Sequence, residues 1–520
     1  MSHAVLRNDL ITRLCLDDGH TCVTEQGEIL NANAQSAKLD DIIKAVQTLP
    51  IMIGKAPNIT AVPQEYIETL LETLTQSTTH STQDKEKESL LGLHLIALCQ
   101  AAVNKGASDI HVEVYRKLTR YLIRVDGKRE VLNRFADGQS ALHQDRTKGI
   151  DLSSYVFSTL GNQDVNEREP ANDSFDVNLV WDNKPKTFEF RAALMPLDRG
   201  IKLTLRCLTP RDKPLQLSDM DLPLSYITQL IRAVNQRGGG IVITGPMGSG
   251  KSSLIYALLD TIDSTARCIH ALEDPVEFEQ KGICKTAVEP NTETKLGSGV
   301  YKDYAFYAKE QLRHDIDVAP FGELRDHPAA KEFCRKAETG GLAITTLHTN
   351  SVLGIPQTFI EQMGISPAIV SAPDLMRLFV HQKLIRKLCP HCALTLHEAL
   401  ENETTKEKAL LLQSLLSDDN EHCRIKSPLG CDKCEKKGEK GRVVVMELVV
   451  LDDEDRQFIF QQDYLKWKQV LKSKGWPDIR DHTLSRIKRG QVDIQSASEQ
   501  INDLIPIKSN EIYMNMREEL

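Results

Sequence analysis

A glycine-rich stretch near the middle of the chain carries the residues with the clearest chemical potential. It reads Gly245-Pro246-Met247-Gly248-Ser249-Gly250-Lys251-Ser252-Ser253 and contains the pattern G-x-x-x-x-G-K-[ST]. An apolar run (240–244) precedes it and a run of helix formers (253–259) follows it. Glycines let backbone N–H groups approach phosphates, and the N-terminus of the following helix adds the positive end of its dipole.

This arrangement predicts a nucleotide site in which Lys251 contacts the β- and γ-phosphates and the Ser252 hydroxyl holds Mg²⁺. The alternative is a glycine-rich turn that binds nothing. Because the complete pattern stands between a predicted strand and a predicted helix, we favour the nucleotide site and expect ATP and Mg²⁺ as cofactors.

Polar side chains follow three further apolar runs. Glu273 follows 268–272, Glu323 follows 317–321 and His348 follows 342–347. In an open α/β sheet, ligands bind at the carboxyl ends of the strands, so these groups are expected beside the phosphate loop. We predict Glu323 as the base that orients or deprotonates the attacking water, and Glu273 as a supporting residue near the metal-bound water. For each carboxylate the alternative is a helix cap or a surface charge.

Four of the twelve cysteines form two C-x-x-C pairs, Cys389 with Cys392 and Cys431 with Cys434. Thiolates at such spacing bind Zn²⁺ tetrahedrally, and four of them leave no open position, so a structural zinc site is predicted. The alternative is four reduced thiols, and His391, His422 and Cys423 are nearby possible substitutes. The other eight cysteines have no paired spacing and are expected to be small buried hydrophobic residues.

The composition, with 41% hydrophobic and 26% charged residues, fits a soluble globular protein. A chain of 520 residues is too long for a single hydrophobic core, so several domains are expected. The net charge of −9 argues against wide non-specific coating of nucleic acid. No stretch approaches the roughly 20 apolar residues of a membrane span, and the N-terminal residues, with Arg7 and Asp9, do not form a secretory signal. We therefore expect a cytosolic protein that meets membranes through partners.

Changes in residue pattern predict several units in an α/β chain. They are a helical docking region (1–75), a polar linker (76–88), a small α+β domain (89–210), a connector (211–223), a nucleotide-binding domain (224–385), a tetracysteine zinc module (386–445) and a helical C-terminal region (446–520). In the small domain, two predicted strands, 187–191 and 202–206, place Arg191 and Arg206 on the polar face of a sheet. From the pattern alone these arginines are solvated charges.

Taken in order, the motifs resemble those of the secretion-type hexameric ATPases that drive type II secretion and type IV pilus assembly, in the zinc-bearing branch of that family. The resemblance covers about residues 89–445. The matching segments are 107–113, 124–127, Arg191, Arg206, the phosphate loop, 273–277, 322–326, 346–350, 382–392 and 441–442.

The resemblance implies a RecA-like P-loop ATPase domain preceded by a PAS-like small α+β domain. It implies a homo-hexamer whose nucleotide sites lie between these domains, with Arg191 and Arg206 facing the phosphates and His348 in the catalytic set. It also implies a cytoplasmic motor, peripheral at the bacterial inner membrane, that acts on a platform protein to assemble a type IV pilus without binding nucleic acid. A type II secretion motor, a nucleic-acid translocase and a poorly hydrolysing ring component are the alternatives.

The chain departs from the family pattern at several positions. Gly341 stands where the family has a histidine, Phe306 and Lys309 stand where arginines are common, and Ile201 stands where an acidic residue is usual. Pro320 lies in the strand before Glu323, where a missing N–H would interrupt a central ladder. These departures point to a divergent branch, such as the type IVb or conjugative thin pili, and they keep the poorly hydrolysing ring component among the alternatives.

Overall fold

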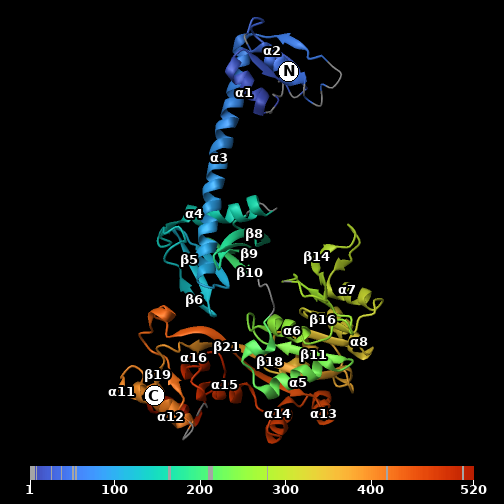
Figure 1. The fold of residues 1–520 in the computed structure, drawn as a ribbon, viewed down its shortest axis with the longest axis vertical. Helices are drawn as coiled ribbons and strands as arrows, with labels where there is room; N and C mark the ends of the chain where they lie inside the picture. Colours follow the sequence, from blue (N-terminus) through green and yellow to red (C-terminus); the bar gives the residue numbers. More distant parts are fainter. Residues whose placement is uncertain are drawn as a thin grey trace.

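The computed structural model describes residues 6, 9–24, 26–36, 38–47, 49, 52, 56–161, 166–208, 215–277, 279–416, 420–505 and 509–520. A long helix, α3 (Gln64–Asn104), separates a small N-terminal unit from the rest of the chain (Figure 1). The N-terminal unit contains α1 (Asp9–Asp18), β1 (Thr21–Val23), β2 (Ile29–Asn31), α2 (Leu39–Gln47) and β3 (Ile59–Ala61). The sequence predicted helices here but no strands, whereas β1, β2 and β3 form a three-stranded sheet, and each strand is too short to show alternation.

Helix α3 includes the segment 76–88, which the sequence predicted as a linker, so this connection is helical. The segment is polar but contains no glycine or proline, and nothing in it breaks a helix. Further along, Leu95, Leu98 and Ala102 of α3 are buried in the core of the small domain.

The small domain is built on a sheet in the order β6-β5-β4-β10-β9-β8. Its elements are β4 (Asp109–Val114), β5 (Leu118–Val125), β6 (Lys128–Val131), β7 (Gln144–Asp145), α4 (Arg146–Ser154), the π-helical turn η2 (Tyr155–Leu160), β8 (Ala171–Trp181), β9 (Lys184–Leu197) and β10 (Gly200–Leu208). The predicted hairpin turn joins β5 to β6, and Asp126 and Gly127 have φ values of 48° and 82°, as a two-residue turn of this kind requires. Strands β9 and β10 are antiparallel, and Arg191 lies directly opposite Arg206.

The nucleotide domain contains a seven-stranded sheet in the order β13-β12-β16-β17-β11-β18-β21. Its elements are η3 (Leu217–Met220), α5 (Leu224–Asn235), β11 (Gly239–Thr244), α6 (Lys251–Leu259), β12 (His270–Glu273), β13 (Cys284–Ala287), β14 (Glu289–Glu293), β15 (Tyr301–Lys302), α7 (Tyr304–Gln311), β16 (Val318–Phe321), α8 (His327–Glu338), β17 (Leu342–Leu347), α9 (Gly354–Gln357), η4 (Thr358–Gln362), α10 (Pro367–Val370) and β18 (Met376–Leu388). All the pairings are parallel except that of β18 with β21. Figure 1 shows helices α5 to α8 around this sheet.

The tetracysteine segment is an insertion between two paired strands of that sheet. It contains β19 (Leu394–Thr395), α11 (Leu396–Glu401), α12 (Lys406–Leu416), β20 (Arg424–Ile425) and η5 (Asp432–Cys434), and is followed by β21 (Glu439–Val450), α13 (Asp453–Gln461), α14 (Tyr464–Ser473), α15 (Ile479–Lys488), α16 (Ile494–Ser498) and α17 (Ser509–Glu518). Strand β21 therefore crosses the predicted boundary at 445, and the C-terminal region begins as a strand. In the part of the chain described, no helix is both long and apolar enough to cross a bilayer.

Six of the eight unpaired cysteines are buried, as expected, whereas Cys268 and Cys284 are exposed. The expectation was wrong for these two because Cys284 begins β13, the edge strand of the nucleotide sheet, and Cys268 precedes β12, the strand beside it.

Pro320 sits in β16, a central strand, and a side chain replaces the hydrogen bond it cannot make. Val318 N and Gly322 N donate to Cys268 O at 3.0 Å and to Leu272 O at 2.8 Å. The carbonyl between those two acceptors is His270 O, which would face the N–H of residue 320. It instead accepts from Gln311 Nε2 at 3.0 Å. The ladder is thus completed by a buried glutamine of α7.

We predict that Gln311→Leu lowers the free energy of unfolding by about 1–3 kcal/mol, because His270 O loses its donor. Pro320→Val supplies an N–H at the same point, so Gln311→Leu/Pro320→Val should lose less stability than Gln311→Leu alone. Urea unfolding followed by Trp467 fluorescence measures this, since Trp467 shares a hydrophobic core with Phe321. Equal losses in the single and double variants would contradict the compensation.

Candidate nucleotide site

The phosphate loop joins β11 to α6, as predicted, and two of its glycines are required by geometry. A Cβ at Gly245, whose φ is +152°, would lie 2.2 Å from Gln382 O of β18. Gly250, directly before the first residue of α6, has a φ of +84°. This left-handed backbone conformation is disfavoured for residues that carry a side chain. The side chain of Gln382 donates from Nε2 to Ser249 O at 2.7 Å. The loop is thus held against β18 by backbone proximity and by one side-chain bond.

Lys251 is buried inside this loop. Its Nζ donates to Gly245 O at 2.9 Å and to Pro246 O at 3.2 Å. Burial lowers the pKa of Lys251 to about 8, and the charge of Glu323 opposes that shift. The ammonium is therefore held at the loop, in an environment that favours its charged form less than water does.

Glu323, His348 and Lys251 form a connected chain at the carboxyl ends of the strands. Glu323 Oε1 lies 3.2 Å from His348 Nε2, and His348 Nδ1 lies 3.5 Å from Lys251 Nζ. The other oxygen of Glu323 accepts from Arg325 Nη2 at 3.0 Å. Arg325 was not among the predicted residues, although it belongs to the matching segment 322–326. Arg325 Nη1 also lies 3.8 Å from Asp274 Oδ2.

Glu273 lies at the end of β12, but its carboxylate is occupied within the fold. Oε1 lies 2.9 Å from Lys285 Nζ, and Oε2 accepts from the Tyr256 hydroxyl at 2.7 Å. The side chain is 9% exposed. These partners were not anticipated from the sequence, because Lys285 and Tyr256 belong to no motif. The supporting role of Glu273 near the metal-bound water stays a prediction.

Arg206 reaches the phosphate loop from the small domain. Its Nη2 lies 3.0 Å from Met247 Sδ, and its Nε donates to Asp109 Oδ1 at 3.2 Å. Arg191, half-buried, lies opposite Arg206 on the adjoining strand. The sheet register therefore brings the predicted pair to one place on the small domain, with Arg206 at the loop itself.

The zinc module also meets the small domain and the phosphate loop. Asp126, in the β5–β6 turn, accepts from Gly441 N at 2.7 Å. The neighbouring Arg442 donates from Nη1 to Gly248 O at 3.4 Å. An ion pair of 2.7 Å joins Lys437 to Glu130 of β6. In the sequence, 124–127 and 441–442 were recognised only as motif matches, and the contact between them was not predicted.

The four predicted cysteines are brought together. Their sulfur atoms all lie within 4.8 Å of one another, and three of the separations are 3.8 Å. A tetrahedral ion with Zn–S bonds of about 2.3 Å requires sulfur atoms about 3.8 Å apart. Burial raises the pKa of Cys434, but N–H groups of Cys431 and Gly438 donate to its sulfur and lower the pKa to about 6. The donor set fits a closed structural zinc site.

The proposed substitutes are not needed for that cluster. Cys423 is buried in a separate hydrophobic core with Ile425 and Leu412. Within the described residues, the metal-ligand cluster found contains the four C-x-x-C thiols and neither His391 nor His422.

The side chain of the buried Lys336 packs against Gly341, the position at which the secretion ATPases have a histidine. A Cβ at this position would lie 2.3 Å from Lys336 Cε. Lys336 Nζ donates to Ile316 O at 2.5 Å. The space that a larger side chain would take is therefore filled by the stem of Lys336.

Comparisons with known proteins agree with this geometry. The profile of a family described as "Type II/IV secretion system protein" matches residues 83–500. The type II secretion system ATPase E of Vibrio cholerae is 30% identical over 404 residues, which are 77% of this chain and 73% of that protein. The type IV pilus assembly ATPase PilB of Pseudomonas aeruginosa is 28% identical over 406 residues, which are 77% of this chain and 66% of that protein.

Two solved structures share the fold. The pilus retraction motor PilT with bound ADP matches 80% of this chain and 98% of its own, with 20% identity and a TM-score of 0.50. The ATPase DotB of Legionella pneumophila matches 77% of this chain and 93% of its own, with 18% identity and a TM-score of 0.52. These likenesses confirm the α/β, RecA-like fold class. Because the family profile covers most of the chain, and its ATPase relatives match over about three quarters of it, the chain belongs to the type II/IV secretion system protein family and is an ATPase.

Proposed function

We propose that the chain is a cytoplasmic homo-hexameric motor that hydrolyses ATP to power type IV pilus assembly at the bacterial inner membrane, where it acts on a platform protein. The observation that carries the proposal is the chain of contacts from Glu323 through His348 to Lys251, with Arg206 of a second domain at the same loop. A type II secretion motor is the second candidate, and the identity to the Vibrio cholerae protein favours it.

The residues of the site divide the hydrolytic work. Lys251 and the backbone N–H groups of the loop bind the phosphates. Ser252 would hold Mg²⁺, which would supply positive charge to offset the charge that develops on them. Glu323 orients and deprotonates the attacking water, and His348 fixes the orientation of that carboxylate. Arg206 and Arg191 close on the phosphates from the small domain and stabilise negative charge as the bond to the leaving group breaks.

The same contacts suggest how hydrolysis moves the domains. Arg442 links the phosphate loop, at Gly248, to the zinc module, and Asp126 links that module to the small domain. A change in the loop between nucleotide states therefore has a direct route to the small domain. Tetrahedral Zn²⁺ on the four thiols would keep the ends of β18 and β21 together, so that the module moves as a rigid body.

The first test is phosphate release from ATP by the purified protein. Lys251→Ala should abolish nucleotide binding, whereas Glu323→Gln should still bind nucleotide and hydrolyse about 10²–10⁴-fold more slowly, because the water loses its base. Glu338→Gln removes an exposed carboxylate of α8 and serves as the matched control, with turnover unchanged. If the wild type binds ATP but turns over no faster than Glu323→Gln, the motor proposal fails for the isolated protein.

Nucleotide affinity should fall as the pH rises above about 8. The lowered pKa of Lys251 means that the free protein loses this charge near pH 8, while bound phosphates favour the charged form and raise the pKa. Binding between pH 8 and 10 should therefore take up close to one proton, measured by calorimetry in buffers of different ionisation enthalpy. Lys251→Arg, which stays protonated, should bind without that uptake. A pH-independent wild-type affinity would contradict the burial of a titrating lysine.

The purified protein should contain about one zinc ion per chain, measured by elemental analysis. Cys431→Ala should lose most of the metal and lower the melting temperature, because the ends of β18 and β21 are no longer joined. Cys284→Ala, which changes an exposed cysteine outside the cluster, should keep the metal content and the melting temperature of the wild type. Full metal content in Cys431→Ala would show that this thiol is not a ligand.

A further inference from the structure

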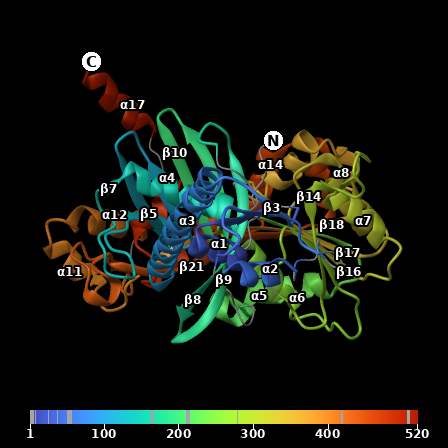
Figure 2. The same cartoon turned by 90° about the horizontal axis from the view of Figure 1, so that it is seen from above.

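Helix α17 presents an apolar surface that is exposed in the part of the chain that the structure describes. Ile512, Tyr513, Met514 and Met516 are 46–67% exposed. Figure 2 shows α17 projecting away from the body of the molecule. A helix of ten residues is marginal in water unless one face packs against something, so α17 needs a partner surface.

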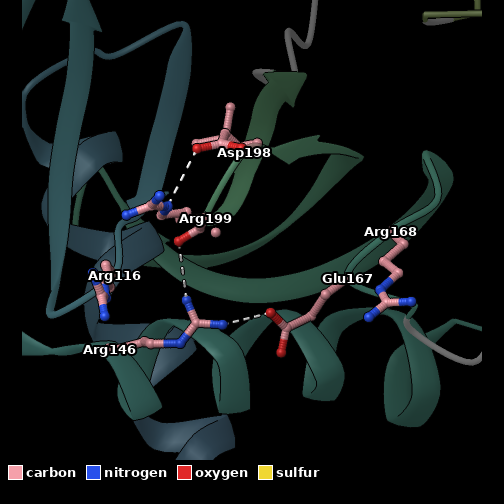
Figure 3. A pocket seen from close by; sticks show the side chains of 8 residues that line it. Arg116, Arg146, Glu167, Arg168, Asp198 and Arg199 are labelled. Atoms are coloured by element: carbon pink, nitrogen blue, oxygen red, sulfur yellow. Dashed lines mark hydrogen bonds and ion pairs between the residues drawn. The ribbon is translucent and has the colours of Figure 1, made fainter.

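A positively charged surface lies on the small domain. Four arginines from separate segments surround a hollow of about 580 Å³ that we call the arginine hollow (Figure 3). They are Arg116, Arg146, Arg168 and Arg199, and the hollow also contains the acidic residues Glu167 and Asp198.

Internal contacts occupy only part of this positive charge. Arg146 donates to Glu167 at 2.6 Å and to the carbonyls of Tyr115 and Arg199 at 3.4 Å. Asp198, which is almost fully exposed, lies 3.4 Å from Arg199. The hollow therefore keeps a formal excess of two positive charges, from four arginines and two acids. The sequence of α17 and the two residues after it has three glutamates against one arginine, an excess of two negative charges.

An apolar hollow adjoins the arginine hollow. It has a volume of about 380 Å³ and is lined by Val114, Tyr115 and Leu197. It shares Leu197 and the charged residues Arg116, Asp198 and Arg199 with its neighbour. Tyr115 and Leu197 are 40% and 39% exposed. The surface thus offers apolar and cationic regions side by side, and α17 offers apolar side chains followed by Glu518 and Glu519.

We propose that α17 of one copy docks on the arginine hollow and the adjoining apolar hollow of a neighbouring copy. The apolar side chains of α17 cover Tyr115 and Leu197, and Glu518 and Glu519 meet the arginines. A neighbouring copy is the occupant because both hollows lie at the end of β10 remote from Arg206, which faces the nucleotide domain. Figure 1 shows α4 at that end, well above the C-terminal part of the chain. This contact goes beyond the proposed motor activity, and its test is independent of hydrolysis.

Self-association of the full-length protein tests the charge match. Glu518→Lys/Glu519→Lys and Arg116→Glu/Arg168→Glu should each weaken association about tenfold or more, measured by sedimentation velocity at low salt. Combining the two pairs of changes should restore association to within about threefold of the wild type. Glu403→Lys/Glu407→Lys, at exposed acidic positions elsewhere, is the matched control and should change nothing. Failure of the combined variant to recover would overturn the proposal.

Cross-linking distinguishes a neighbouring copy from the same chain. A carbodiimide joins carboxylates to amines in contact, and Lys117 and Lys148 lie one and two residues from Arg116 and Arg146. In a mixture of ¹⁴N- and ¹⁵N-labelled protein, links from Glu518 or Glu519 to these lysines should include mixed-isotope pairs. Links found only within one chain, or none in a sample that associates, would contradict docking between copies. Association that pyrophosphate leaves unchanged, while pyrophosphate binds the hollow, would instead assign the hollow to small anions.

Discussion

The close approach of Gly245 to the backbone of β18 is the constraint on which the rest of the structure depends. Because Gln382 O leaves no space for a side chain at 245, the phosphate loop and β18 are positioned as one unit. The same strand ends at Leu388, directly before Cys389, the first of the four clustered cysteines, and pairs with β21, which carries Arg442. A single strand thus connects the loop that holds Lys251 to the module that contacts the small domain.

Residues with spacing-dependent chemistry were predictable from the sequence because topology alone brings them together. Parallel strands place their carboxyl ends at one edge, so Glu323 and His348 had to lie near Lys251 once three strand ends were identified. The clustering of the four thiols followed from their paired spacing. The place of Arg206 at the phosphate loop followed only from the resemblance to the secretion ATPases, because alternation alone predicted a solvated charge. The contacts of Glu273 could not be predicted, since Lys285 belongs to a neighbouring strand whose register no local pattern fixes. The strands of the N-terminal unit were missed because three residues cannot show a period.

The departures from the family pattern are accompanied by local replacements. Pro320 has no N–H to donate between β16 and β12, and the side chain of Gln311 donates instead to the carbonyl oxygen of His270. Gly341 removes a side chain, and the stem of Lys336 fills the space. Buried polar groups and voids both carry a free-energy cost, so a sequence that tolerates such exchanges must offset them nearby. The replacing residues lie outside every motif, which is why motif comparison registers the loss but not the compensation.

The contacts between the small domain and the zinc module are of a kind that nucleotide can change. The ion pair of Glu130 with Lys437 is partly exposed, with side chains 26% and 37% accessible, and such pairs contribute about 0–1 kcal/mol each. The hydrogen bond from Gly441 to the Asp126 carboxylate adds about 1.5–3 kcal/mol, the usual range for a charged acceptor. A ligand shifts a conformational equilibrium by its difference in affinity for the two states, and a few kcal/mol is enough against contacts of this size. By contrast, the loop, β18 and the cysteine cluster form a continuous packed body. In the motor that we propose, the weak contacts at its edge are therefore where a change at the phosphates would become movement between domains.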